Sequence, residues 1–260
     1  MARDTWVVAG AVLTIVLLAG LYTVYGIGMS MTAVDMTGMA GPIGEPMAMG
    51  PGTTWTWSYA LLVFLMWWVM MIAMMTPSAT PTLLLYTALK RHGSESASAT
   101  KLSLIFLSGY LLIWGGFSLL ATGMQWLTET LGVVDGPMMT LASRPIAGVV
   151  LILAGLFQFS ALKTACLRQC SSPADFLTRH RRTGSAGALV MGVHHGAYCF
   201  GCCWALMALL FVGGIMNLYW IVGLAVYVLA EKILPNPRIF ARCTGTVLIL
   251  WGLWCILTSF

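Results

Sequence analysis

Long uncharged apolar stretches dominate this sequence, and they restrict the possible fold more than any other feature. A helix needs about 20 mostly apolar residues to cross a lipid bilayer. Seven stretches reach approximately that length: 6–26, 55–76, 102–122, 145–163, 186–212, 215–234 and 239–259. Only 8% of the 260 residues are charged, whereas a water-soluble domain carries about 25%. The sequence therefore predicts an all-α, polytopic membrane bundle of about seven transmembrane helices, with residues 1–260 forming one transmembrane domain.

The basic residues predict how the helices are oriented, because cytoplasmic loops of membrane proteins are enriched in Lys and Arg. With a cytoplasmic N-terminus and alternating loops, every Lys and Arg except Arg144 falls on the inside, including Lys163 and Lys232. This pattern predicts a multi-pass protein of the bacterial inner (cytoplasmic) membrane with its C-terminus outside. The net charge of +5 then reflects membrane topology, so the lipid bilayer is the expected partner and nucleic acid is not.

The longest outside connection, residues 27–53, is rich in Met, Gly and Pro. Its six methionines are Met29, Met31, Met36, Met39, Met47 and Met49. The Gly and Pro content predicts an exposed, irregular loop. Methionine thioethers are soft ligands that suit Cu(I), but methionine also serves as an adaptable packing residue. Copper binding and packing therefore both remain possible functions of these methionines.

The second apolar stretch carries methionines at helical spacing. They form two parallel i, i+4 rows, made of Met66, Met70 and Met74 and of Met71 and Met75. Helices in bilayers normally pack through Leu, Ile, Val and Phe, so this density favours metal binding by Met66, Met70 and Met74, with packing as the alternative. We expect Pro77 and Pro81, which follow, to break or kink the helix.

The fifth apolar stretch contains "GVHHGAYCFGCCWALM", residues 192–207. At about 100° per residue, His195, Cys199 and Cys202 share one stripe of a helix, Cys203 lies at its edge and His194 points away. Intramembrane ionisable groups are usually functional, so these five residues are candidate metal ligands. The alternatives are buried small cysteines and histidines that form interhelical hydrogen bonds.

One helix alone cannot bring this whole stripe to a single ion. Cys202 lies about 10 Å along the axis from His195, so facing residues must complete each site. Gly192 and Gly196 form a GxxxG pair, which lets a partner helix approach closely. We expect the methionine rows of the second apolar stretch to lie on that partner.

A basic cytoplasmic segment, residues 164–184, carries Cys166 and Cys170 at i, i+4 spacing. On a helix both thiols share a face, and nearby cations favour the thiolate form that binds metal or reacts. We place this pair at the cytoplasmic surface, where a disulfide does not persist. The alternative is two surface cysteines without a role.

Several motifs together resemble a family of bacterial integral membrane proteins of unknown function that are described as predicted metal-binding. The matching segments occur in order along most of the chain: "MWWVMMIAMMTPSATP" (66–81), "ALKTACLRQCSSP" (161–173), "HGAYCFGCCWALM" (195–207), "GGIMNLYW" (213–220) and "EKILP" (231–235). The resemblance implies a polytopic fold and a metal site. Its implied ligands are Met70, Met74, Cys166, Cys170, Cys199, Cys202 and Cys203. It implies no reaction.

These patterns favour a Cu(I)-binding membrane protein that transports copper or delivers it to a copper-carrying partner or a membrane cuproenzyme. Four soft-ligand clusters follow one another across the bilayer, which suits stepwise ligand exchange and slightly favours import. Zinc is disfavoured because thioethers are poor zinc ligands. One alternative is a membrane thiol redox protein using Cys199, Cys202 and Cys203, because CxxC spacing occurs at 199–202. Another is an assembly or scaffold subunit whose Cys and Met residues only pack.

Overall fold

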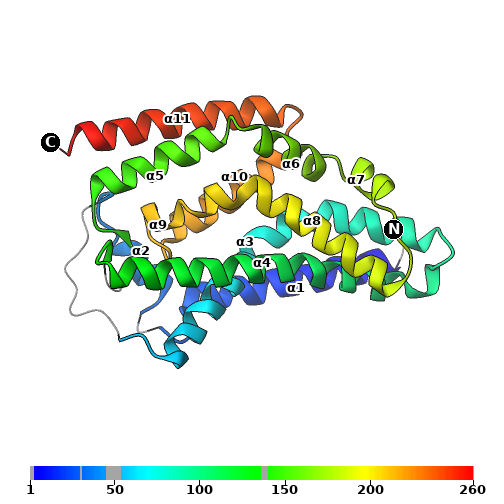
Figure 1. The fold of residues 1–260 in the computed structure, drawn as a ribbon. Coiled ribbons are helices and arrows are strands. Elements are labelled where there is room, and N and C mark those ends of the chain that lie inside the picture. The colour runs from blue at the N-terminus through cyan, green and yellow to red at the C-terminus, as the bar shows by residue number, and fades with distance from the viewer. Residues whose placement is uncertain (1–2, 30, 45–53, 136–139, 260) are drawn as a thin grey trace.

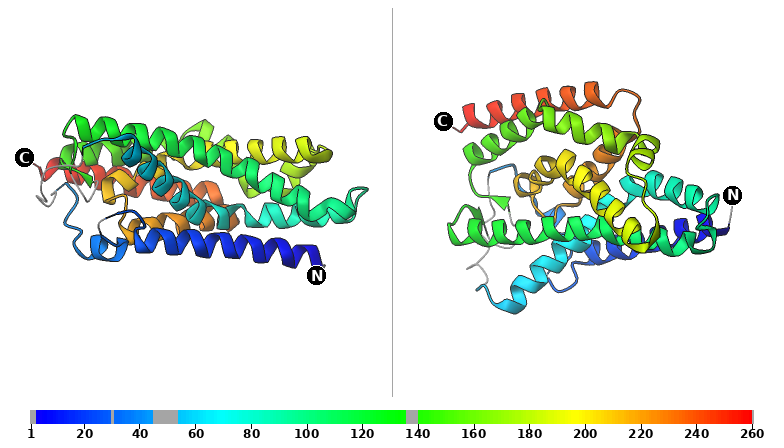
Figure 2. Two further views of the ribbon diagram at one scale, coloured as in Figure 1. Left: turned by 90° about the horizontal axis from the view of Figure 1, so that it is seen from below. Right: turned by 45° about the vertical axis from the view of Figure 1, so that its right-hand side comes forward.

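Long helices running along a common direction make up most of the fold (Figures 1 and 2). The computed structural model describes residues 3–29, 31–44, 54–135 and 140–259. The longer helices are α1 (Arg3–Tyr25), α3 (Trp57–Arg91), α4 (Ala99–Thr130), α8 (Gly184–Met207), α10 (Leu218–Ile233) and α11 (Pro237–Leu257). The shorter elements are α2 (Ala33–Gly38), η1 (Ser96–Ser98), β1 (Val134–Asp135), β2 (Thr140–Leu141), α5 (Arg144–Phe157), α6 (Ala161–Ser171), α7 (Pro173–Arg179) and α9 (Leu210–Gly213). The prediction of an all-α architecture is confirmed, apart from the short β1–β2 pairing.

Five helical segments are long and apolar enough to cross a membrane: Asp4–Tyr25, Trp57–Arg91, Ser96–Thr130, Gly184–Gly213 and Pro237–Leu257. A sixth candidate is the pair α5–α6, which bends by 64°. The predicted single helix over 145–163 is interrupted because Ser160 caps a new helix, accepting a hydrogen bond from the Lys163 amide at 3.0 Å. The stretch 215–234 contains α10, whose 16 residues extend about 24 Å, less than the bilayer core of about 30 Å.

Of the expected break or kink in α3, the break does not occur, since α3 runs without interruption for 35 residues through Pro77 and Pro81. Hydroxyl groups supply hydrogen bonds to carbonyls in this segment. Ser78 Oγ donates to the Met75 carbonyl at 2.8 Å and Thr80 Oγ1 donates to the Thr76 carbonyl at 2.9 Å. Neighbouring side chains of this kind are what make proline tolerable inside buried helices.

Helices α5 and α11 lie side by side through reciprocal glycine contacts (Figure 1). A Cβ on Gly148 would lie 2.7 Å from the Gly252 carbonyl oxygen, and a Cβ on Gly155 would lie 2.8 Å from that of Gly245. Small residues at these positions allow the two backbones to approach closely. The pair forms one side of the bundle, and α10 and α8 lie between it and α1, α3 and α4 (Figure 1).

The methionine-rich connection is more ordered than predicted where the structure describes it. It contains α2, whose N-terminus is closed by a capping box between Thr32 and Asp35. Met36 is buried in the core, and the Thr37 hydroxyl accepts a hydrogen bond from the Leu218 amide of α10 at 2.9 Å. Met47 and Met49 lie outside the described residues. The expectation of an exposed, irregular loop is therefore wrong for α2.

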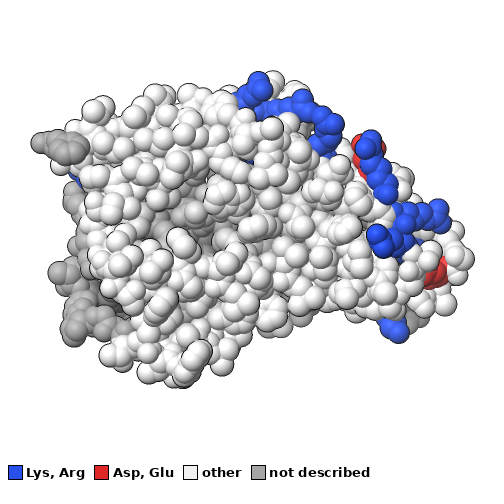
Figure 3. All heavy atoms as spheres, viewed as in Figure 1, with Lys and Arg blue, Asp and Glu red and all other residues white. Residues whose placement is uncertain are grey.

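Basic side chains gather toward the end of the molecule that carries the N-terminus, as Figure 3 shows for one face. At this end Lys90 and the Gly184 amide both bind the Glu95 carboxylate, the latter at 2.7 Å. Arg91 pairs with Asp4 at 2.5 Å. The N- and C-termini lie at opposite ends of the bundle (Figure 1). These contacts fix the ends of α1, α3 and α8 relative to one another.

Candidate metal centre

The position of α8 is set by close contact with α4, not with α3 as predicted. A Cβ on Gly192 would collide with the Phe106 carbonyl oxygen of α4, and one on Gly196 would lie 3.1 Å from the Tyr110 carbonyl oxygen. In return, a Cβ on Gly109 would lie 2.5 Å from the Leu189 carbonyl oxygen. The GxxxG prediction of a close partner helix is therefore confirmed. The predicted identity of that partner was wrong, because the helix that packs on the two glycines of α8 is α4, which contributes a glycine of its own to the contact.

A group of four buried thiols is the main chemical feature of the interior. Cys202 Sγ lies 3.2 Å from Cys203 Sγ and 4.0 Å from Cys170 Sγ. Cys199 lies one helical turn before Cys202 and Cys203, and Cys202 Sγ donates to the Cys199 carbonyl at 3.1 Å. We call Cys170, Cys199, Cys202 and Cys203 the thiol cluster. It joins α6 to α8.

The predicted surface location of the Cys166–Cys170 pair is wrong. Both thiols are buried, because α6 packs on α8. Gly201 makes room for this contact, since a Cβ there would lie 2.7 Å from Cys166 Sγ. Two clusters that the sequence places at different depths are thus one cluster in the folded chain.

A buried lysine contacts the thiol cluster. Lys232 Nζ donates to Ser78 Oγ at 2.8 Å and to Cys199 Sγ at 3.1 Å. Tyr110 Oη lies 3.2 Å from the same Cys199 sulfur and donates to the Met75 carbonyl at 2.9 Å. Two helices therefore contact the Cys199 sulfur, α4 through Tyr110 and α10 through Lys232. Helix α3 is linked to it indirectly, because Ser78 binds Lys232 and the Met75 carbonyl binds Tyr110.

A second buried lysine is neutralised by a carboxylate. Lys163 Nζ lies 2.7 Å from Glu231 Oε2, and both side chains are almost fully buried. Lys163 also donates to the Cys202 carbonyl at 2.8 Å, and Tyr227 Oη donates to the other Glu231 oxygen at 3.3 Å. This network ties α6, α8 and α10 together next to the thiol cluster.

Neither Lys163 nor Lys232 was among the candidate site residues predicted from the sequence. Lys163 and Lys232 were assigned to cytoplasmic segments as part of the positive-inside pattern, but the folded chain buries both. The signal that identifies them is their place at the ends of apolar stretches, next to otherwise uncharged sequence. Ionisable residues in that position are functional candidates in their own right.

The two histidines occupy different environments. His195 is buried, and its ring packs against Phe106, Tyr110 and Phe176 at centroid distances of 5.8, 5.7 and 5.1 Å. Neither of its ring nitrogens has a hydrogen-bond partner among the residues that the structure describes. His194 is half-buried, with its ring centroid 5.7 Å from that of His180. A ligand role is therefore more compatible with the position of His195.

The methionine rows are buried but belong to a different layer from α8. Met66, Met70 and Met74 are almost fully buried on α3, which packs on α1, α4 and α10. The expectation that these rows lie on the helix that packs against Gly192 and Gly196 is wrong, because that helix is α4. The link from α3 to the thiol cluster is made by Ser78 and the Met75 carbonyl.

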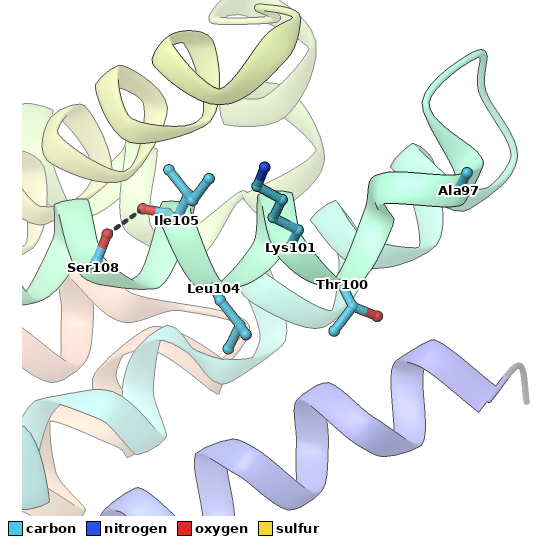
Figure 4. Close-up of a pocket in the computed structure, with 6 residues that line it drawn as sticks. All are labelled: Ala97, Thr100, Lys101, Leu104, Ile105 and Ser108. Atoms are coloured by element: carbon cyan, nitrogen blue, oxygen red, sulfur yellow. Dashed lines mark hydrogen bonds between the residues drawn. The ribbon is translucent and has the colours of Figure 1, made fainter.

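The donor atoms gathered in this interior are soft: the four thiols of the cluster and the thioethers of the methionine rows are all buried. In the described ranges, no group of three or more His, Cys, Asp or Glu side chains is arranged to hold a metal ion. Zinc sites in proteins are almost always four-coordinate. Thiolate and thioether ligands select Cu(I). A separate shallow groove on α4, lined by Ala97, Thr100, Lys101, Leu104, Ile105 and Ser108 (Figure 4), contains none of the candidate ligands.

Comparison with known proteins gives one result that bears on this chemistry. The model of a family described as "PpoB2: Copper chaperone" matches residues 64–255. The match includes the thiol cluster, both buried lysines and the methionine rows, and it begins after the methionine-rich connection. Searches of curated proteins and of solved structures gave no match.

Proposed function

The chain belongs to the PpoB2 copper chaperone family, and from this premise we propose that it holds Cu(I) on its thiol cluster for delivery to a partner. The recipient is a copper-carrying protein or a membrane cuproenzyme. The observation that carries the proposal is the separation of 4.0 Å between the buried sulfur atoms of Cys170 and Cys202.

This separation suits an ion held between two sulfurs. A zinc–thiolate bond measures about 2.3 Å, so two thiolates on opposite sides of an ion of similar size lie about 4.6 Å apart. Cys170 and Cys202 need to open only slightly to reach that distance. Cys203 lies too close to Cys202, at 3.2 Å, to share an ion with it in this way. We therefore assign Cys170 and Cys202 as the primary ligands.

The remaining candidate residues have secondary roles in the proposal. Cys199, Cys203 and Cys166 are exchange ligands that receive the ion as it enters or leaves. His195 is the available nitrogen ligand, because its ring nitrogens have no other partner in the described structure. The thioethers of Met66, Met70 and Met74 provide weak soft ligands on the neighbouring helix, and His194 has the weakest support.

Delivery is favoured over transport because the expected series of clusters across the bilayer does not form. Cys170 contacts Cys202 of α8, and Cys166 is buried beside Gly201 of α8, so the pair does not form a separate cluster at the cytoplasmic surface. One central cluster suits holding and handing over an ion, whereas stepwise passage needs several weak sites. In our proposal the chain lies in the bacterial inner membrane with its basic end in the cytoplasm, an orientation that the gathered Lys and Arg side chains support.

A Cu(I) titration of the purified protein tests the proposal. In reducing buffer, with bathocuproine disulfonate as the competing chelator, we expect retention of stoichiometric Cu(I). The Cys202→Ser variant is expected to lose the ion to the chelator. Cys243→Ser is the matched control, because Cys243 is an exposed cysteine far along the sequence from the cluster, and it should retain copper. Failure of the wild-type protein to retain Cu(I) overturns the proposal.

The second candidate is thiol redox chemistry, which the short Cys202–Cys203 contact favours. In that case the wild-type protein would retain no Cu(I), but mild oxidation would remove two thiols reversibly. Counting free thiols before and after reduction distinguishes this outcome. A chain that neither retains Cu(I) nor forms a reversible disulfide would instead fit the scaffold alternative.

A further inference from the structure

Two histidines outside the thiol cluster lie next to each other, one directly after α7 and one on α8. The ring centroids of His180 and His194 are 5.7 Å apart, and both side chains are half-buried. His180 Nδ1 lies 3.1 Å from the Phe176 carbonyl oxygen. Because a carbonyl oxygen only accepts, Nδ1 donates, and the lone pair of Nε2 stays free to bind a metal ion. A backbone carbonyl that orients an imidazole in this way is typical of histidines that ligate metals.

The spacing of the two rings suits an ion held between them. A nitrogen ligand binds its metal at about 2 Å and lies about 1 Å from its own ring centroid, so two imidazoles on opposite sides of one ion have centroids about 6 Å apart. The observed 5.7 Å is close to this value. Imidazole is a copper ligand but a less soft one than thiolate, and the exposed residues Arg179 and Arg181 flank His180. The pair can therefore hold the same ion as the thiol cluster, but more weakly.

A continuous row of contacts leads from this pair to the thiol cluster. The Phe176 ring lies 4.9 Å from the His180 ring and 5.1 Å from the His195 ring. His195 packs in turn on Tyr110 at 5.7 Å, and the Tyr110 hydroxyl lies 3.2 Å from Cys199 Sγ. His195 is 1% exposed, and its ring nitrogens have no hydrogen-bond partner in the described residues. Leaving a buried polar group unsatisfied is costly, so this imidazole points to a ligand role on the way to the cluster.

We propose that His180 and His194 form a second metal site, through which the ion reaches and leaves the thiol cluster. This inference rests on the proposed function, because it takes the thiol cluster as the final position of the ion. Along α8, His194 precedes Cys202 by eight residues, about 12 Å of helix, so one ion cannot contact both. His195 supplies the nitrogen between them. The half-buried pair gives the ion an access that the buried thiols lack.

Transfer kinetics test this inference. Stopped-flow mixing follows the passage of Cu(I) from its bicinchoninate complex to the protein, and an excess of free bicinchoninate follows the reverse passage. We expect His180→Gln and His194→Gln each to slow loading about tenfold, the scale of loss when the support of a metal site is removed. Release should slow by the same factor, because a site on the path changes both rates and leaves the equilibrium affinity of the thiol cluster unchanged.

A histidine outside the pair provides the matched control. His92 is exposed and follows the last residue of α3, so His92→Gln should load and release Cu(I) at the wild-type rates. If either glutamine variant of the pair does not fold, His180→Asn or His194→Asn replaces it.

Imidazole NMR locates the second site without relying on rates. In protein carrying isotope-labelled histidine, Ag(I) added beyond the first equivalent should shift the signals of His180 and His194, assigned from their variants, and leave that of His92 in place. Wild-type rates in both variants, a loss of affinity with an unchanged loading rate, or unshifted signals for both histidines would overturn the inference while Cu(I) retention by the wild type persists. Absence of that retention would instead overturn the proposed function.

Discussion

The sulfur atoms of Cys170 and Cys202 lie 4.0 Å apart although 32 positions separate the two residues in the sequence. The contact joins the short helix α6 to the long helix α8. It depends on Gly201, which faces Cys166 one turn from Cys170. A pair of cysteines that looks like a surface motif therefore belongs to the interior of the bundle.

Replacing either member of this pair should abolish tight Cu(I) binding. We expect Cys170→Ser to weaken Cu(I) binding at least tenfold, because a hydroxyl is a hard ligand and copper(I) prefers soft ones. Chelator competition measures the loss. Cys255→Ser offers a second buried control, since Cys255 is a buried cysteine on α11, a helix that carries no member of the thiol cluster. Equal losses of Cu(I) affinity in Cys170→Ser and Cys255→Ser would mean that the substitutions disturb the fold in general and not the metal site.

A methyl group at Gly192 should separate α8 from α4. Its Cβ would collide with the Phe106 carbonyl oxygen, and overpacking of this kind costs about 1–3 kcal/mol. We expect Gly192→Ala to lower the unfolding temperature in detergent. Gly116→Ala is the control, because a Cβ at Gly116 meets no atom within 4 Å. The account of α4–α8 packing is wrong if both variants unfold at the wild-type temperature.

The Lys163–Glu231 pair should behave as a buried ion pair. Lys163→Met leaves the Glu231 carboxylate buried without its cation, which costs about 3–5 kcal/mol. Replacing both residues, as in Lys163→Met with Glu231→Leu, removes the unpaired charge and should restore much of the lost stability. Chemical unfolding in mixed micelles measures both changes. A double variant no more stable than Lys163→Met would contradict the ion-pair interpretation.

The contact between Glu95 and Lys90 should make stability depend on pH. The hydrogen bond from Lys90, followed by that from the Gly184 amide, lowers the pKa of Glu95 in the folded protein. A carboxyl group with a lowered folded-state pKa stabilises the protein above its ordinary pKa, and the benefit disappears as pH falls through the folded value. We expect the wild type to unfold at a higher temperature than Glu95→Gln at about pH 7, with the difference shrinking as the pH is lowered below the ordinary carboxyl pKa. A difference that stays constant over this range would rule out the contribution.

The helical fold could be predicted because hydrophobic length is a local property of the sequence. Five apolar stretches form helices long enough to cross a membrane. The break between α5 and α6 was not predicted. The Ser160 side chain caps the start of α6 and so ends the helix before it, and a hydropathy pattern does not detect a helix cap. At Pro77 no break occurs, because α3 continues with hydroxyl and tyrosine hydrogen bonds to its carbonyls close by.

The site was predicted in part for the same reason. Helical spacing places His195, Cys199 and Cys202 together, and all three are buried. Spacing along one helix does not indicate which other helix packs against it, so the helix expected to pack on Gly192 and Gly196 was wrong. The buried positions of Cys170 and Lys232 also depend on tertiary packing, although an ionisable residue at the end of an apolar stretch gives a usable signal.

X-ray absorption at the copper edge of the Cu(I)-loaded protein tests the central claim most directly, because it reports the atoms bound to the ion. We predict a first shell of sulfur that is lost or replaced by oxygen or nitrogen in Cys170→Ser and in Cys202→Ser, and that is unchanged in Cys243→Ser. A first shell of oxygen or nitrogen in the wild-type protein, or a sulfur shell that survives both Cys170→Ser and Cys202→Ser, would contradict the account.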